Sequence, residues 1–157
     1  EASVEQVCHR LVTLRRPGAE GVPFAFLRVD PAGNISKRFS LPDLRLPRYG
    51  GACPLWAVYS PPRNPAATAV QRVRLSEGPE FLFVARSIVK PPLGFGEPGE
   101  SYSLMIGCEA LHGPRVVYAD APAGPAVETG INCHRCGREG CPQRAYPSTL
   151  PSGLPSA

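Results

Sequence analysis

Three cysteines lie within nine positions near the end of the chain. Cys133, Cys136 and Cys141 form the pattern C-x2-C-x4-C-P. Two thiols in a C-x2-C turn can point at one centre, and a third thiol five residues on can close the same face. Gly137 and Gly140 permit the tight backbone path between them. The pattern therefore predicts a bound metal ion or iron–sulfur cluster.

A complete site of this kind needs a fourth ligand. Cys53 lies between a Gly-Gly pair and Pro54 at the expected start of a short helix, where the helix dipole favours a thiolate. Cys108 lies on the apolar face of an expected strand, which is typical of a core residue. We favour Cys53 and keep Cys108 as the alternative, because spacing does not fix a distant ligand. His112 is a further candidate, and His134, inside the C-x2-C turn, is expected to point away.

Four thiolates suit either Zn2+ or an iron–sulfur cluster. Zinc ribbons carry two C-x2-C knuckles, whereas this chain has one knuckle, a C-x4-C-P extension and a remote cysteine. This asymmetry favours a [4Fe-4S] cluster, with Zn2+ as the alternative. Nearby arginines would offset the negative charge of the thiolates; they are Arg135, Arg138 and Arg144.

The sequence carries none of the common catalytic motifs. It has no HExxH, P-loop, GxSxG or GxGxxG pattern. The Gly-rich stretch 94–100 contains a proline and two glutamates, which argue against phosphate binding and favour a connector. His9 and His112 have no carboxylate or nucleophile partner nearby in the sequence. The chain is therefore predicted not to be an enzyme.

Basic side chains lie among apolar ones in two expected strands. Arg86 and Lys90 share one face of the strand 80–90, and two further cations precede an aromatic residue in the strand 35–39. Such a surface could bind an acyl chain that carries a phosphate-rich head. The alternative is a solvated sheet face with salt bridges, and the sequence leaves both open. The candidate ligand-binding residues are Lys37, Arg38, Phe39, Arg86 and Lys90.

Sequence periodicity predicts the elements that would position these residues. A capping box at Ser3 and Gln6 predicts a helix over 3–16 that ends at Pro17-Gly18, with Cys8 on its apolar face as a core residue. A short helix is expected to follow Pro54. Alternating patterns and turn signals predict strands at 24–30, 35–39, 68–75, 80–90, 101–108 and 115–120. The predicted fold class is α+β, an antiparallel sheet with flanking helices like a GAF or PAS sensor, followed by a cysteine-rich metal or cluster segment at 131–147.

Composition indicates one ordinary folded domain. The chain has 157 residues, of which 43% are hydrophobic and 19% are charged, and its net charge of +4 does not by itself imply nucleic acid. No apolar run approaches the roughly 18 residues that span a membrane. Six cysteines with this spacing favour a reducing cytoplasm over a disulfide framework. We expect a single domain over 1–147 and a disordered tail over 148–157, and the capped helix directly after Glu1 suggests a domain excised from a longer protein.

The chain resembles the C-terminal domain of the short-chain fatty acyl transcriptional regulators, bacterial proteins that control the methylcitrate pathway and the glyoxylate bypass. The resemblance covers most of residues 24–147 and does not extend to residues 1–20 or beyond Pro147. Its most specific part is the C-x2-C-x4-C-P-Q-R-A-x-P pattern. The matching stretches are GNISKRFS (33–40), RYGGACPLWAVY (48–59), FLFVARSIVKP (81–91), YSLMIGCEALH (102–112), VVYAD (116–120) and INCHRCGREGCPQRAYP (131–147).

The resemblance implies a regulatory function. A full-length member would carry an N-terminal helix-turn-helix domain that binds DNA and a middle IrrE-like domain, both absent from this chain. The C-terminal domain would sense short-chain acyl-CoA and carry an iron–sulfur cluster on the motif cysteines. Because Cys53 and Cys108 both lie in matching stretches, the resemblance does not choose between them.

We therefore expect a cytoplasmic regulator of propionate and acetate metabolism, able to form a homodimer and without membrane contact. The alternative is a zinc-stapled structural or oligomerisation module that binds no small ligand.

Overall fold

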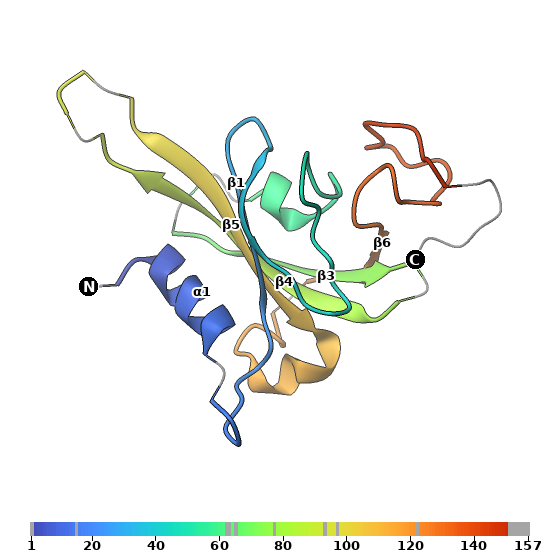
Figure 1. Cartoon of the computed structure of the whole chain (residues 1–157), viewed down its shortest axis with the longest axis horizontal. Helices are drawn as coiled ribbons and strands as arrows, with labels where there is room; N and C mark the ends of the chain where they lie inside the picture. The colour runs from blue at the N-terminus through green and yellow to red at the C-terminus, as the bar shows by residue number, and fades with distance from the viewer. Residues whose placement is uncertain are drawn as a thin grey trace.

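A computed structural model of the chain describes residues 2–14, 16–61, 64, 66–76, 78–92, 94–96, 98–121 and 123–150. Within these residues, six strands form one curled sheet in the order β2-β1-β5-β4-β3-β6 (Figure 1). The strands are β1 (Ala25–Val29), β2 (Ile35–Phe39), β3 (Ala69–Leu75), β4 (Glu80–Lys90), β5 (Glu100–Glu109) and β6 (Val127–Thr129). Helix α1 is Val4–Thr13, and two short 3-10 helices are η1 (Ala57–Tyr59) and η2 (Ala110–Arg115).

The α+β class is confirmed, but the sheet is mixed. Strands β2, β1, β5, β4 and β3 are antiparallel neighbours, whereas β6 pairs parallel with β3. The predicted last strand at 115–120 is wrong. Residues 110–115 form η2 and the chain then turns, because Pro114 has no N–H for a strand ladder and Val116 N instead donates to Gly113 O. The likeness to GAF or PAS sensors stays a prediction.

Strands β1 to β5 follow the predicted pattern closely, whereas α1 ends at Thr13 and not at residue 16, and β6 was not predicted. Helix α1 begins with the expected capping box, in which Gln6 N donates to Ser3 Oγ and Ser3 N to Gln6 Oε1. The segment after Pro54 forms a turn and then the three-residue η1, with Pro61 following close behind. The first residues of the predicted disordered tail, 148–150, are ordered, and Thr149 N donates to His134 O at 2.9 Å. The rest of that prediction, 151–157, lies outside the described residues.

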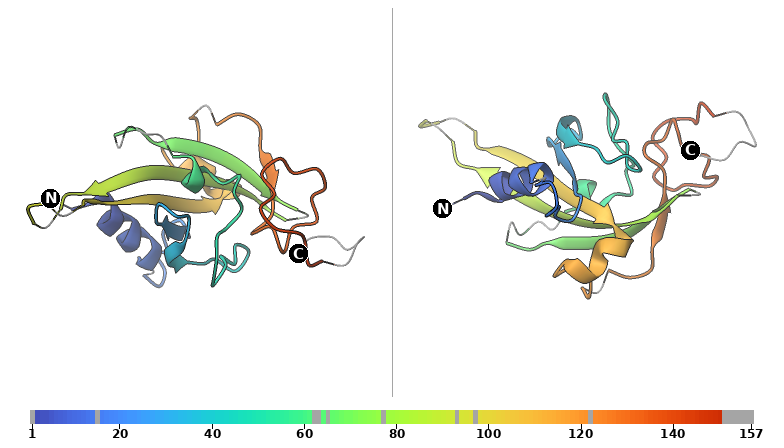
Figure 2. Two further views of the ribbon diagram at one scale, coloured as in Figure 1. Left: turned by 90° about the horizontal axis from the view of Figure 1, so that it is seen from above. Right: turned by 60° about the horizontal axis from the view of Figure 1, so that its bottom comes forward.

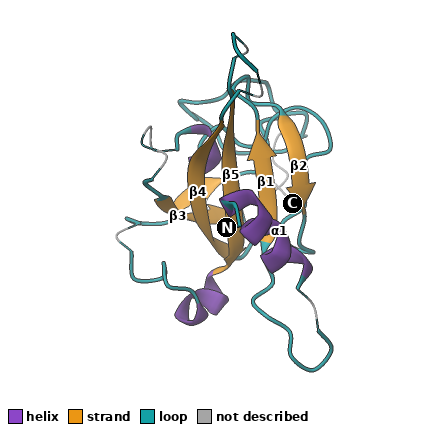
Figure 3. Ribbon diagram, turned by 90° about the vertical axis from the view of Figure 1, so that its left-hand side faces the viewer, coloured by secondary structure: helices purple, strands orange, loops and turns teal. Residues whose placement is uncertain are grey.

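The two faces of the sheet are covered by different segments. One face packs against the loop 41–58, whose Trp56 and Leu44 are fully buried. Helix α1 covers the opposite face, where Cys8 and Val12 pack on Phe26 of β1 and Leu104 of β5. Figure 3 shows α1 crossing these two strands. Cys8 is therefore a core residue, as predicted. None of the described helices has the length and apolar character needed to cross a membrane.

Strands β4 and β5 continue beyond the body of the sheet as a hairpin. The pairing of β3 with β4 stops at Ala85, whereas β4 and β5 stay paired as far as Lys90 and Glu100. Figures 1 and 2 show this hairpin projecting to one side. Part of the Gly-rich stretch 94–100 lies in its turn and so connects two strands, as expected.

We predict that Gly107→Ala lowers the free energy of unfolding by about 1–3 kcal/mol, because the substitution overpacks the core. An added Cβ would lie 2.5 Å from Cδ1 and 2.8 Å from Cε1 of Phe83. The Phe83 ring is fully buried and contacts the Trp56 ring edge-on at 5.1 Å, so it has little room to move. Urea unfolding followed by circular dichroism would measure the loss. Gly21→Ala is the control, because its nearest neighbour is Leu14 O at 4.0 Å; equal stability of both variants would contradict the prediction.

Candidate functional site

The loop that carries Cys53 is fastened to the sheet by side chains. Gln71 of β3 accepts from Ala57 N and donates to Leu55 O, both at 2.8 Å. Trp56 Nε1 donates to Thr129 Oγ1 at the end of β6, at 3.1 Å. A buried N–H without a partner is costly, so this bond holds the loop against β6. Cys53 therefore has a fixed position close to the segment that follows β6.

The segment 131–150 folds back beside the same loop (Figure 2). Arg144 holds it together, because its guanidinium donates to the carbonyl oxygens of Cys133, Cys136 and Arg138. Arg138 in turn donates to Glu128 O at 2.7 Å. In the structure, both arginines donate hydrogen bonds to backbone carbonyl oxygens. Their predicted effect on the charge of the thiolates stays a prediction.

Three thiols from the two segments lie near one another. Cys53, Cys133 and Cys136 are all buried and free. Burial raises the pKa of Cys53, hydrogen bonds from the N–H groups of Leu55 and Gly130 oppose that rise, and Cys136 and Cys133 add to it by their charge. Cys136 packs so closely on Gly130 that an added Cβ there would lie 2.9 Å from its sulfur.

The remaining members of the motif are placed differently. Cys141 is half-buried, and His134 is exposed and stacks on Tyr146 with ring centroids 5.0 Å apart, so it points away as predicted. Among the residues that the structure describes, no three histidine, cysteine or carboxylate side chains gather closely enough to enclose a metal ion. The structure thus places Cys53 within electrostatic reach of Cys133 and Cys136, but the described residues do not form a metal site.

Cys108 lies apart from this group. Leu104, Ile106 and Cys108 stand at every second position of β5 and so share the sheet face that α1 covers in part. Cys53 belongs to the core under the opposite face. Burial, with a smaller contribution from the charge of Glu109, raises the pKa of Cys108 to about 11. Its surroundings are those of a core cysteine.

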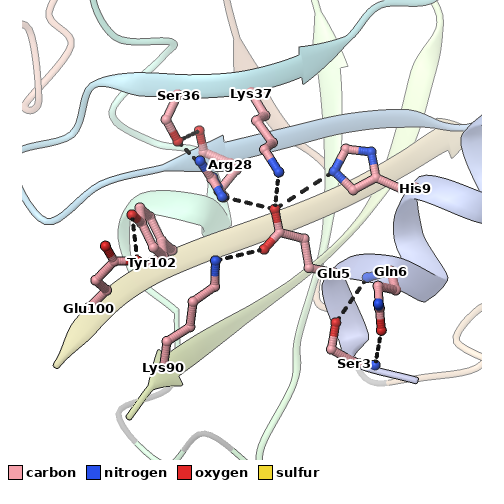
Figure 4. A network of polar contacts seen from close by, with 10 residues as sticks. All are labelled: Ser3, Glu5, Gln6, His9, Arg28, Ser36, Lys37, Lys90, Glu100 and Tyr102. Carbon is pink, nitrogen blue, oxygen red and sulfur yellow. Dashed lines mark hydrogen bonds and ion pairs between the residues drawn. The ribbon is translucent and has the colours of Figure 1, made fainter. Parts of the chain in front are cut away.

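A second cluster lies under α1, around the carboxylate of Glu5 (Figure 4). Glu5 Oε1 is 2.9 Å from Nη1 of Arg28 on β1 and 2.7 Å from Nζ of Lys37 on β2. Glu5 Oε2 is 3.4 Å from Nζ of Lys90 on β4. Cations from three strands thus meet one carboxylate from the helix. We call Arg28, Lys37 and Lys90 the cation trio.

An aromatic ring borders the cation trio. The Tyr102 ring lies under the Arg28 guanidinium at 4.3 Å and the Lys90 ammonium at 5.1 Å, which are cation–π distances. Tyr102 OH donates to Glu100 at 3.1 Å. The ring therefore makes cation–π contacts with two of the three cations, Arg28 and Lys90.

The structure separates the predicted ligand-binding residues into groups. Lys37 and Lys90 meet at Glu5, and Phe39 packs under α1. Arg86 lies on β4 four residues before Lys90, on the same face. Arg38 faces the other way and donates to Leu46 O at 3.1 Å.

Sequence reasoning missed Arg28, Tyr102 and Glu5. Arg28 follows Phe26 by two residues in β1, so the two side chains share one face of the strand. The same pattern, a cation on an otherwise apolar face, selected Lys90 in β4. The arrival of Glu5 from the helix had no sequence signal, because it depends on how α1 docks.

Comparison with known proteins identifies the family. The model of the family described as short-chain fatty acyl coenzyme A regulator, C-terminal, matches residues 13–152. The chain belongs to this regulator family. The family resemblance seen in the sequence is thereby confirmed, but its predicted bounds were too narrow, because the match begins at residue 13 and runs on to residue 152.

Relatives of this chain are named as regulators. The chain is 41% identical to the HTH-type transcriptional regulator RamB of Mycobacterium tuberculosis over 93% of its own length and 32% of that protein. It is 45% identical to the propionyl-CoA carboxylase regulator of Cereibacter sphaeroides, again over 93% of this chain and 32% of the relative. The chain therefore spans about a third of the length of these relatives.

A solved structure has a similar fold. A Mycobacterium tuberculosis transcriptional regulator superposes with a TM-score of 0.79 at 36% identity, over 94% of this chain and 46% of that one. The mixed sheet is thus the fold of a known regulator.

We predict that Glu5 makes stability depend on pH. Burial alone would raise its pKa, but the hydrogen bond from Lys37 and the charges of the cation trio outweigh burial and lower the pKa from 4.5 to about 2. Because the folded-state pKa lies below the unfolded value, the stabilisation is fully present above pH 4.5 and is lost as the pH falls towards 2. The loss between pH 6 and pH 3 should be about 2 kcal/mol.

Urea unfolding at pH 6 and at pH 3 would measure how much of the free energy of unfolding is lost between the two pH values. In Glu5→Gln the difference between pH 6 and pH 3 should shrink by that amount. Glu80→Gln is the matched control, since it removes a carboxylate from the exposed ion pair with Arg74. An unchanged pH dependence in Glu5→Gln would refute the assignment.

Proposed function

We propose that this chain is the ligand-sensing domain of a bacterial transcription regulator that controls short-chain fatty acid metabolism. It binds a short-chain acyl-CoA and holds a [4Fe-4S] cluster, and it catalyses no reaction. Relatives named as HTH-type regulators support a DNA-binding domain in another part of such a protein. The change in transcription then comes from a conformational shift that the acyl-CoA or the cluster favours by binding one state more tightly.

The observation that carries the ligand proposal is the cation trio. Lys37 and Lys90 are the two lysines of the whole chain, and both lie within 3.4 Å of the same carboxylate. Arginine and lysine groups that converge in this way suit the phosphates of coenzyme A. The apolar residues beside them, including Phe39 and Ile88, suit a short acyl chain. The family description names the same class of ligand.

The cluster proposal rests on the donor set. Cys53, Cys133, Cys136 and Cys141 would be the ligands, and the interaction of Cys53 with two of the motif thiols favours it over Cys108. Three buried free thiols from two fastened segments are suitable soft ligands for iron–sulfur or zinc. The bound group would tie the C-terminal segment to the loop 41–58. Zn2+ in the same place, without a small ligand, is the alternative.

We predict that the domain, purified without oxygen, contains about four irons and as much inorganic sulfide per chain and absorbs visible light. Cys53→Ala should lose the iron, because it removes a ligand, whereas Cys108→Ala should retain it. The two variants are matched, since both remove a buried thiol, and circular dichroism would verify that each folds. Stoichiometric zinc without sulfide would favour the zinc alternative, and iron loss only in Cys108→Ala would reverse the ligand assignment.

We also predict that propionyl-CoA binds and that Lys37→Ala with Lys90→Ala weakens binding by tenfold or more, since each lost phosphate contact is worth about 1 kcal/mol or more. Isothermal titration would measure the affinity. Arg74→Ala is the control, because this exposed cation pairs with Glu80 away from the site. Equal affinity in the lysine variant would show that the ligand binds elsewhere.

A further inference from the structure

The cation trio carries more positive charge than its partner neutralises. Three cations share the carboxylate of Glu5. Among the described residues, the one further carboxylate at the cluster, Glu100 opposite Lys90, accepts from Tyr102 OH, so one positive charge is in excess. Arg28 is 12% exposed at its side chain, whereas Lys37 and Lys90 are 44% and 45% exposed. Their heads can therefore be reached from solvent. An excess of this kind favours an anion with more charge than a carboxylate.

The cations and the anion of the cluster differ in how firmly they are held. The cation trio stands on β1, β2 and β4 of one hydrogen-bonded sheet. Glu5 stands on α1, a helix of ten residues. A helix of that length is only marginally stable alone, so α1 depends on its contacts with the sheet. The helix, and not the sheet, is therefore the part that can leave.

Within the described part of the chain, one polar atom of α1 is buried without a hydrogen-bond partner when the helix is docked. His9 Nε2 is buried without a hydrogen-bond partner in the described residues, and it lies 3.7 Å from Glu5 Oε1. The outward face of α1 exposes Val7 and Leu11 at 47% and 40%, and Leu14, directly after the helix, is 43% exposed. A buried polar atom without a partner costs stability. The ion pairs of Glu5 therefore add to the apolar packing of Cys8 and Val12 in holding α1 on the sheet.

We propose that the cation trio is an anion-binding site in which Glu5 occupies the place of a ligand phosphate. A phosphate ester and the docked helix then exclude each other, and α1 is a cap that the ligand displaces. This inference rests on the proposed function, since it concerns the same surface. It adds an internal competitor and a moving element to that site.

The floor beneath the cap defines the class of ligand. Departure of α1 would uncover the apolar patch of Phe26, Leu104 and Ile106, next to the cation trio. A surface with cations at one end and apolar side chains at the other suits a phosphate ester that carries a short apolar chain. Cys8, buried at 8% exposure under α1, would become accessible at the same time.

The first experiment compares the affinity of propionyl-CoA for the wild type, Glu5→Gln and Glu80→Gln by isothermal titration. Glu5→Gln removes the competing charge, so we expect binding at least about tenfold tighter than in the wild type. Glu80→Gln removes an equal charge from a distant ion pair and should bind like the wild type. Ser3→Ala removes the N-cap hydrogen bond that stabilises the start of α1 and changes no charge. It should also tighten binding, by a few-fold.

The second measurement follows α1 directly. Alkylation of Cys8, located by peptide mass mapping, should accelerate when propionyl-CoA is added to the wild type and should be fast without ligand in Glu5→Gln. Circular dichroism would verify that each variant keeps its sheet.

The outcomes separate the two proposals. Wild-type binding that Glu5→Gln leaves unchanged or weakens, with Cys8 protected throughout, would overturn the cap and leave the acyl-CoA proposal standing. Binding by Glu5→Gln alone would support the cap strongly. Absence of binding by every variant would remove the proposed ligand and the cap together.

Discussion

The buried indole of Trp56 is the contact on which the arrangement of the cysteines depends. Its ring packs edge-on against Phe83 in the centre of the sheet, and its N–H donates to Thr129 at the end of β6. The two partners of that hydrogen bond are 73 positions apart in the chain. Because breaking the bond would leave a buried donor without a partner, the loop of Cys53 and the start of the motif segment are held in one place.

The sheet gives the domain two functional faces that share the same strands. The side chains of β1 alternate between them, so that Leu27 belongs to the core under the cysteine loop while Phe26 lies under α1. The loop of Cys53 covers the first face, and the cation trio lies on the second. Because interiors are closely packed, a change in what covers one face acts on strands that also form the other.

The charge pattern explains why the helix and the sheet are joined by a single carboxylate. Lysines and an arginine on neighbouring strands repel one another, and their close approach on β1, β2 and β4 requires an anion. In the docked state that anion is Glu5, which belongs to α1 and not to the sheet. The surface is thus built for an anion, and its occupant is attached to the most easily detached element.

The sequence by itself determined the local elements and the family. The capping box placed the start of α1, alternation placed β1 to β5, and the cysteine pattern with its flanking stretches identified the regulator family, because these signals depend only on neighbours along the chain. It failed at 115–120, where an alternating pattern was outweighed by Pro114. Only the tertiary structure brought Cys53 near Cys133 and Cys136 and placed Glu5 against the cation trio. These contacts join residues far apart in the chain, and they are decided by how the helix and the loop pack on the sheet.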